Sequence, residues 1–339
     1  MSKRIGYFDL IKTIIELTKR PESLKLSKLS DKEIIKLLKT ASANRVLFLL
    51  CKNIKQYNYL DRTHRLNSLI DKILIQGQEI NNYYASLLRK VKRLFETHNI
   101  NYLIVKTDRM VDHVLSDIDI TIDKESFGKA RELLEEMAVN KNICEKEGRW
   151  HFKFENKVQL DIHRTGEDWY SDNFLNTADI WKNVQSREFL GDFYPFPSAQ
   201  IEWILNALNI IYEKYTITYL DLLFFLKSKD VNHVEISKIA QDHGWDIGLR
   251  ILNKYLSKLE KQIKQNSKDN TIILPKMFSN IDFLKIFIAR LFSPYKNCRI
   301  SLYYFLYFIY CKIRFILTRK SRIPFYGSWF NFGEENTFL

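Results

Sequence analysis

The 339-residue sequence predicts an α+β protein in which a small mixed sheet lies between two helical regions. Three observations support this prediction. Apolar residues recur every three or four positions through 64–98, as in a helix with one buried face. The pattern then changes to short alternating, β-rich runs, and the helical period returns after residue 196. We therefore expect an N-terminal helical region at 1–98, a sheet domain at 99–196, a helical domain at 197–295, and a C-terminal helix and tail at 296–339.

The sheet domain is expected to contain about five strands and one clear helix. Runs rich in β-branched and aromatic residues predict strands at 100–106, 117–122, 150–156, 157–164 and 193–196. The strands at 150–156 and 157–164 meet at a tight turn, and the run at 124–138 has helical spacing. After the sheet, helices are predicted at 197–215, 217–228, 235–243, 245–262, 280–292 and 300–318.

Composition is that of an ordinary globular protein with a basic bias. The formal net charge of +13 favours a polyanionic partner, namely a nucleotide, a nucleic acid or an anionic membrane. Because the charges are spread along the chain, a general basic composition explains them equally well. Four scattered cysteines without a Cys-x-x-Cys pair argue against a disulfide framework or a zinc site and favour the cytoplasm. Charged residues interrupt the first 20 positions, which predicts an amphipathic helix rather than a signal peptide.

The main candidate site is the stretch LSDIDITID at 115–123. Residues two apart on a strand point to the same side, so Asp117 and Asp119 are expected to share a face. The isoleucines between them would form the buried backing. Two neighbouring carboxylates repel each other unless a cation lies between them, and Mg²⁺ takes a few carboxylates together with substrate phosphates.

A third carboxylate is available on a later strand. Asp161 interrupts the apolar run VQLDIHR, about forty residues after the pair. The intervening helix and strand would allow Asp161 to lie beside the pair, and two-metal phosphoryl transfer needs such a third ligand. The alternative is that all three aspartates face solvent on a half-exposed sheet. A strand-embedded aspartate at this distance favours the metal site.

These segments resemble the nucleotidyltransferase superfamily, whose catalytic domain is the palm of DNA polymerase β. The resemblance rests on NYLIVKTDRMVDHVLSDIDITID followed by WHFKFENKVQLDIH, and it points to the uncharacterised nucleotidyltransferase family of bacteria and archaea. It extends over about residues 60–265, including the predicted helical domain. It implies a palm fold, Mg²⁺ or Mn²⁺ as the cofactor, and an NTP as the donor substrate.

The resemblance also implies roles for residues. Asp117 and Asp119 would ligate the metal, and Asp161 would complete the site and help to activate the acceptor hydroxyl. The reaction would move a nucleoside monophosphate from the NTP to a hydroxyl or phosphate acceptor by in-line displacement at the α-phosphorus. The acceptor stays open among a sugar phosphate, a small molecule, a protein and an RNA.

The loop before the aspartates departs from the family pattern. The family has glycine followed by glycine or serine there, which allows the backbone to approach a phosphate closely, whereas this chain has VKTDRM. Thr107 can replace the serine as a hydroxyl donor, and Lys106 and Arg109 can supply positive charge. Ser116 and His163, beside the aspartates, complete the predicted substrate-binding residues. Because of this departure, the alternative function is a catalytically degenerate palm module that binds a nucleotide or RNA.

Several neighbouring residues have a structural interpretation as well. His163 is expected on the same strand face as Asp161, and a structural hydrogen bond is the alternative to substrate contact. His151 is expected to be structural, and Lys153 to face solvent. Asp221 is expected to orient or cap a helix rather than take part in chemistry.

The C-terminal segment SLYYFLYFIYCKIRFILTRKSR combines an apolar run with a basic end. The uninterrupted run at 302–311 is too short to span a bilayer. A helix at 300–322 would suit peripheral contact with the inner face of an anionic membrane. It would also suit nucleic acid, through aromatic stacking on bases. A core helix whose basic end is favoured by the helix dipole is the third interpretation.

Overall fold

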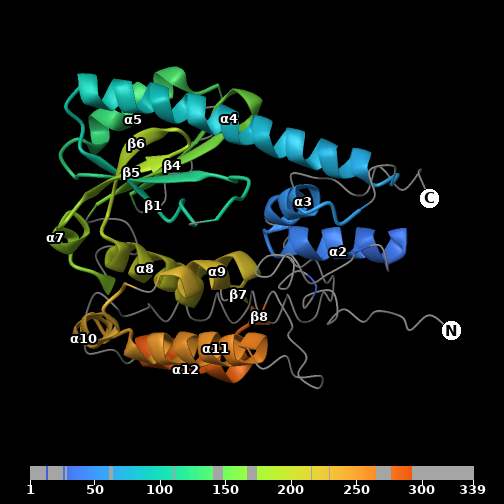
Figure 1. Ribbon diagram of the computed structural model, residues 1–339. Coiled ribbons are helices and arrows are strands. Elements are labelled where there is room, and N and C mark those ends of the chain that lie inside the picture. The colour runs from blue at the N-terminus through green and yellow to red at the C-terminus, as the bar shows by residue number, and fades with distance from the viewer. Residues whose placement is uncertain are drawn as a thin grey trace, which may run out of the picture.

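The computed structural model describes residues 13, 26, 29–60, 64–109, 111–139, 148–165, 174–214, 216–228, 230–264 and 276–291. Within these residues a four-stranded mixed sheet has one long helix across one side and further helices on the other side (Figure 1). The predicted α+β class is therefore confirmed.

The helices before the sheet are α2 (Asp31–Ala43), α3 (Leu47–Gln56) and α4 (Asn67–Thr97). The long helix predicted at 64–98 is thus confirmed as α4. Its first half buries Ile70 and Ile73 in a core shared with the other helices, and its second half buries Tyr84 and Phe95 in the core beneath the sheet. Because α4 belongs to both cores, it joins the helical region to the sheet rigidly. The domain boundary at residue 98 stays a prediction.

The main sheet contains β1 (Tyr102–Val105), β2 (Ile118–Ile122), β3 (Arg149–Lys153) and β4 (Gln159–Arg164) in the order β1-β2-β4-β3. Strands β2 and β4 are parallel, and the other two pairs are antiparallel. Helix α5 (Phe127–Met137) follows β2, as predicted. The predicted tight turn before β4 is the 3-10 turn η3 (Glu155–Lys157), in which Asn156 has a positive φ of 58°. Asparagine tolerates this left-handed conformation better than most residues.

The two faces of the sheet have different neighbours. Ile118, Ile120 and Ile122 are buried together with α4 and α5. Because side chains alternate along a strand, Asp119 and Thr121 point to the opposite face. On the same principle Leu103 and Val105 of β1 belong to the core of the surrounding helices. The polar residues of β2 therefore look toward α8 (Ala199–Leu208) and α9 (Tyr219–Lys227), which lie on that side (Figure 1).

The strand predicted at 193–196 does not join the main sheet and is one of the two strands of a second sheet. Strand β5 (Gln185–Phe189) pairs with β6 (Asp192–Phe196) in an antiparallel hairpin. Its turn residues Leu190 and Gly191 both have positive φ, as a two-residue hairpin turn of the primed type requires. The sequence QSREF has little apolar alternation because β5 lies largely at the surface, and for this reason the prediction missed it. Six strands lie in the described residues of 99–196, against a prediction of about five.

The predicted helices after the sheet are present in the described residues. Helix α8 continues as the π-helix η4 (Asn209–Lys214), and α9 follows a short strand β7 (Thr216–Ile217) that pairs with β8 (Lys276–Met277). The described residues after α9 form three more helices: α10 (His233–Asp242), α11 (Asp246–Lys264) and α12 (Asn280–Leu291). A short helix, α7 (Thr177–Ile180), precedes β5. The helix predicted at 300–318 and almost all of the N-terminal amphipathic segment lie outside the described residues. No helix in the described part of the chain is long and apolar enough to cross a membrane.

Candidate active site

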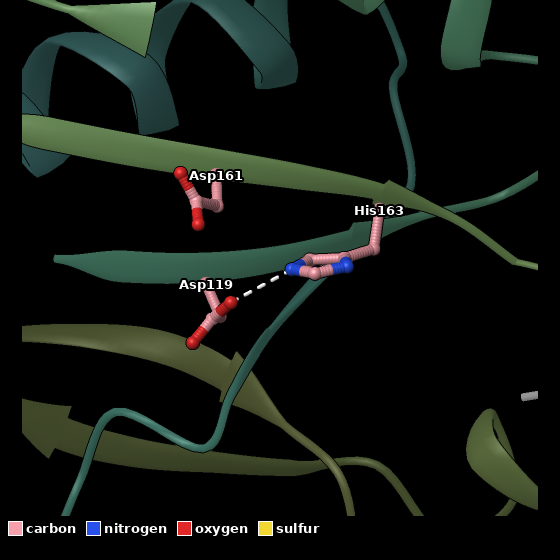
Figure 2. Close-up of side chains that lie close together, drawn as sticks. All are labelled: Asp119, Asp161 and His163. Carbon is pink, nitrogen blue, oxygen red and sulfur yellow. Dashed lines mark hydrogen bonds and ion pairs between the residues drawn. The ribbon is translucent and has the colours of Figure 1, made fainter. Parts of the chain in front are cut away.

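The parallel pairing of β2 with β4 brings two of the predicted carboxylates side by side. Asp119 is the register partner of Asp161, and His163 lies two residues further along β4. One ligand atom from each of these three residues lies within 4.8 Å of the others (Figure 2). We call Asp119, Asp161 and His163 the carboxylate row. A helix and a strand separate Asp119 from Asp161 in sequence, as predicted, and the sheet closes the distance between them.

Asp119 is held ionised by two basic groups. His163 Nε2 lies 2.7 Å from Asp119 Oδ1, and the Lys106 ammonium lies 3.5 Å from the same oxygen. Burial alone would raise the pKa of Asp119, but Lys106, His163 and Arg149 together hold this pKa well below its usual range. The His163 side chain is fully buried, so solvent does not reach it beside Asp119.

Asp161 is also paired with basic groups, both from the neighbouring strand. Arg149 Nη2 lies 2.5 Å from Asp161 Oδ2, and His151 Nδ1 forms a short contact with Asp161 Oδ1. The structure therefore places His151, which was expected to be structural, directly on a predicted ligand. The β3–β4 hairpin is symmetric about Asn156, and His151 is the register partner of Asp161. Because the turn at Asn156 is recognisable in the sequence, its position would have been enough to predict that His151 lies opposite Asp161.

The atypical loop begins with a residue in a conformation that usually belongs to glycine. Lys106 has a φ of 55°, in the left-handed region. The loop thus has the glycine-type backbone turn that the family pattern implies, with a buried lysine side chain in addition. Thr107 Oγ donates to the carbonyl oxygen of Val105 at 2.9 Å and accepts from the backbone N–H of Asp119 at 3.1 Å. The Thr107 hydroxyl group, which donates to one strand and accepts from the other, therefore ties the end of β1 to β2.

Asp117 lies just before β2, which begins at Ile118, and it is not among the three residues whose ligand atoms lie within 4.8 Å of one another. The expectation that both aspartates belong to one strand was therefore wrong, and a role of Asp117 as a metal ligand stays a prediction. Asp117 instead accepts a hydrogen bond of 2.6 Å from Ser116 Oγ, which in turn accepts one of 3.0 Å from Arg45 Nη2. Tyr84 donates to the carbonyl oxygen of Ser116 at 2.6 Å. These bonds fix Ser116 and Asp117 as a loop, so the two-residue strand period does not reach them.

Arg109 is buried and joins the loop to the helices α8 and α9. Its side chain is 5% exposed, contacts Asn206 Oδ1 of α8 and lies 3.7 Å from Asp221 Oδ1 of α9. Asp221 accepts from the backbone N–H of Thr218 at 3.0 Å and so caps α9, as expected. Among the described residues, Arg109 thus has protein partners in the place where a phosphate contact was predicted, and its substrate role stays a prediction.

The carboxylate row has a donor set that fits a divalent cation. Carboxylate oxygens suit Mg²⁺ and Mn²⁺, and a nearby imidazole nitrogen suits Mn²⁺ better than Mg²⁺. Asp119 and Asp161 are both buried or nearly so, and their oxygens face each other across neighbouring strands (Figure 2). His163 Nε2 must carry a proton to donate to Asp119, so ligation by this nitrogen requires the Nδ1–H tautomer.

A separate cavity of about 440 Å³ lies against the loop between β1 and β2. It is lined by loop residues, the β5–β6 turn, and single side chains of α3, α4 and α9, and none of the carboxylate row lines it. The cavity therefore does not mark the candidate active site.

Comparison with known proteins decides the family. A family described as uncharacterised nucleotidyltransferase matches residues 30–259, which is more than half of the chain. The chain belongs to this nucleotidyltransferase family. No curated protein matches it. Among solved structures, the lincosamide antibiotic adenylyltransferase LnuA, lincomycin-bound, is 18% identical, with a TM-score of 0.33 over 43% of this chain and 96% of that chain. The sequence resemblance to nucleotidyltransferases is thus confirmed, and the matched region of this nucleotidyltransferase includes Asp117, Asp119 and Asp161.

Proposed function

We propose that this nucleotidyltransferase moves a nucleoside monophosphate from an NTP to a hydroxyl or phosphate acceptor, with Mg²⁺ or Mn²⁺ held by Asp119 and Asp161. The observation that carries the proposal is the parallel register that places these two carboxylates side by side, with His163 at the same site. Family membership supports the reaction type. The acceptor class stays among a sugar phosphate, a small molecule, a protein and an RNA.

Each residue of the site would have its own role in the reaction. When bound, the metal would neutralise phosphate charge and orient the donor. Lys106, whose ammonium is 3.5 Å from Asp119, adds positive charge for the phosphate chain at the turn of the loop. Asp161 takes the proton of the acceptor hydroxyl. The acceptor oxygen forms a bond to the α-phosphorus, the bond from this phosphorus to the bridging oxygen breaks, and pyrophosphate leaves.

Transfer of a radiolabelled nucleotide tests the proposal. Each of the four NTPs, labelled at the α-phosphate, would be incubated with the protein, Mg²⁺ or Mn²⁺, and cell extract as the source of acceptors. We expect a labelled product with at least one NTP, and its loss in Asp119→Asn and Asp161→Asn. Asp71→Asn is the matched control, because Asp71 lies on the exposed face of α4 and pairs only with Lys55 among the described residues. Equal labelling by all four proteins would overturn the proposal.

A second function is favoured by the charge balance of the carboxylate row. Lys106 and Arg149 already supply one positive charge to each carboxylate, as expected of a palm module that binds a nucleotide without transferring it. Calorimetric titration of ATP with and without Mg²⁺ separates the two functions. Binding that needs no metal and survives Asp119→Asn, together with no labelled product, would favour the binding module.

A further inference from the structure

The cavity against the loop between β1 and β2 has no part in the proposed function. Its volume of about 440 Å³ lies within the range of roughly 300–1,000 Å³ that is usual for small-molecule sites. Its walls come from the loop, the β5–β6 hairpin, the helices α3 and α4, and the end of α9. Because no residue of the carboxylate row lines it, a ligand bound here would occupy a second site.

The loop wall of the cavity is held in place by Asn81 of α4. Asn81 Nδ2 donates to the carbonyl oxygen of His113 at 2.9 Å, and Asn81 Oδ1 accepts from the backbone N–H of Leu115 at 3.1 Å. Both ends of this amide group are thus bonded to the loop. The wall is therefore preformed, and a ligand would not have to pay the entropic cost of ordering the loop in order to bind.

His113 presents a hydrogen-bond acceptor to the cavity. It lines the cavity, is 9% exposed, and burial lowers its pKa to about 4, so its imidazole is neutral at neutral pH. Nδ1 lies 2.9 Å from the carbonyl oxygen of Val111, which can only accept, so Nδ1 carries the proton and Nε2 keeps a lone pair. Nε2 has no partner among the described residues and is not one of the orphaned polar atoms that are closed off from solvent. This edge of the ring therefore opens to the cavity.

The charged groups that line the cavity are mostly carboxylates. Asp108, Asp112 and Glu188 belong to the lining, against one ammonium group, that of Lys227. Glu188 is exposed and has no ion pair in the described part of the chain. Ionised carboxylates only accept hydrogen bonds, as does His113 Nε2, so the lining favours a ligand that donates and carries positive charge.

The cations that already contact these carboxylates leave room for another. Lys52 lies 2.5 Å from Asp112, but both side chains are about half exposed, and such pairs contribute little free energy. Arg187 lies 3.6 Å from Asp108 and 2.6 Å from Glu202, so two carboxylates share one guanidinium group. An additional cation in the cavity would therefore meet uncompensated negative charge.

A single metal ion does not suit the cavity. Within the described residues, the carboxylate row is the one set of three histidine, cysteine, aspartate or glutamate side chains whose ligand atoms lie within 4.8 Å of one another. The acidic groups of the cavity are thus too far apart to share an ion. Apolar side chains, among them Leu49, Val111 and Phe189, form the rest of the walls and would suit the body of an organic molecule.

We propose that this cavity binds a small organic cation, namely a molecule with an apolar body and an ammonium group. The ammonium group would lie at the carboxylates and donate to His113 Nε2, and the body would pack against the apolar walls. The inference goes beyond the proposed function and does not depend on it, because the cavity and the carboxylate row share no residue.

Ligand-detected NMR titration of the full chain with tryptamine tests the inference. Tryptamine joins an indole ring to an ammonium group through two methylene groups. Indole-3-propionate has the same ring and methylene groups but ends in a carboxylate, so it is the matched control ligand. We expect tryptamine to bind with a Kd below about 1 mM, and indole-3-propionate to bind at least about 10-fold more weakly, because its carboxylate would face carboxylates of the lining.

Variants of the lining locate the binding. Glu188→Gln and Asp112→Asn are each expected to weaken tryptamine binding roughly 5-fold, because each removes a partly exposed partner of the ammonium group. Leu49→Trp keeps all charges but fills part of the cavity from α3, and it should weaken binding at least as much. Glu136→Gln on the exposed side of α5 makes the same change of charge outside the lining and should leave binding unchanged. Unchanged thermal unfolding shows that each variant is folded.

The outcomes of this test decide the inference without any transfer reaction. Absence of tryptamine binding to the wild type, or equal binding of indole-3-propionate, would overturn it. Unchanged affinity in the lining variants would also contradict it, because tryptamine would then bind elsewhere, and a loss as large in Glu136→Gln as in Glu188→Gln would reflect net charge alone. Weaker binding in the lining variants with an unchanged control supports the inference, even if nucleotidyl transfer is never detected. If Leu49→Trp does not fold, Glu188→Gln and Asp112→Asn decide.

Discussion

The carboxylate row and the buried pair of Arg109 and Asp221 both hold carboxylates next to cations, but the row is the more exposed of the two. In the row, Asp119 and Asp161 are neutralised by Lys106 and Arg149, one cation for each carboxylate. In the buried pair, Arg109 lies 3.7 Å from Asp221 Oδ1, its side chain also contacts Asn206, and neither charged side chain is more than 5% exposed. Further along, Glu202 and Asp108 share one cation, Arg187.

This difference follows from the element to which each carboxylate belongs. Asp119 belongs to a strand, so the register of the sheet sets its neighbours. Asp221 belongs to the first turn of α9, so the packing of the loop against this helix sets which cation it meets.

The largest effect should come from Asp119, and a much smaller one from Asp117 of the same motif. Asp119→Asn is expected to lower nucleotidyl transfer roughly 1000-fold, because a metal ligand contributes several kcal/mol to stabilising the transition state. Asp117→Asn keeps the hydrogen bond from Ser116 and is expected to cost at most about 10-fold. Initial rates with the best labelled NTP measure both. Losses of equal size would break the comparison, since the two aspartates would then act as one unit.

The next effect concerns the buried pair of Arg109 and Asp221. Arg109→Met is expected to lower the free energy of unfolding by at least about 3 kcal/mol, because it leaves the Asp221 carboxylate buried without its guanidinium partner. Lys52→Met removes a pair with Asp112 whose two side chains are 50% and 52% exposed, and it should cost less than about 1 kcal/mol. Urea unfolding compares them. A loss at Arg109 no larger than that at Lys52 would contradict the assignment of Arg109 as a buried tie between loop and helices.

A pH experiment extends the comparison to Glu202, the next buried carboxylate. Burial raises the pKa of Glu202 from 4.5 to about 7, against the opposing effect of Arg187, 2.6 Å away. Between these two values the folded protein binds more protons than the unfolded chain, so the contribution of Glu202 to stability is complete below pH 4.5 and is lost as the pH rises to about 7. The loss is on the order of 3 kcal/mol.

Glu202→Gln should remove this slope. The difference between the unfolding free energies of wild type and variant isolates Glu202 from His113, whose pKa burial lowers to about 4 and whose contribution runs in the opposite direction. If the difference between these two unfolding free energies does not change with pH, the pKa of Glu202 is not raised in the folded protein.

The smallest effect tests the backbone of the loop. Lys106→Gly and Lys106→Ala both remove the ammonium beside Asp119, but only glycine accepts a φ of 55° without strain. We expect the glycine variant to be more stable than the alanine variant by about 1 kcal/mol, measured by chemical unfolding. Greater stability of the alanine variant would mean that Lys106 is not held in the left-handed conformation in solution.

The sequence alone determined the elements and the class of chemistry. The period of α4, the alternation of β2, and the aspartate embedded in β4 are local patterns, and each is visible because one face of its element is buried. The family resemblance added the reaction type. The surface hairpin strand β5 was missed because its exposed side chains carry no such pattern.

Only the tertiary structure decided which charges meet. Because β2 and β4 pair in parallel, the third member of the carboxylate row is His163 and not Asp117. The hairpin turn placed Arg149 and His151 on Asp161, and the packing of helices against the loop brought Arg45 to Ser116 and Asn206 to Arg109. Residues 71 or 97 positions apart have no local pattern that could reveal their meeting, because strand pairing and helix packing bring them together.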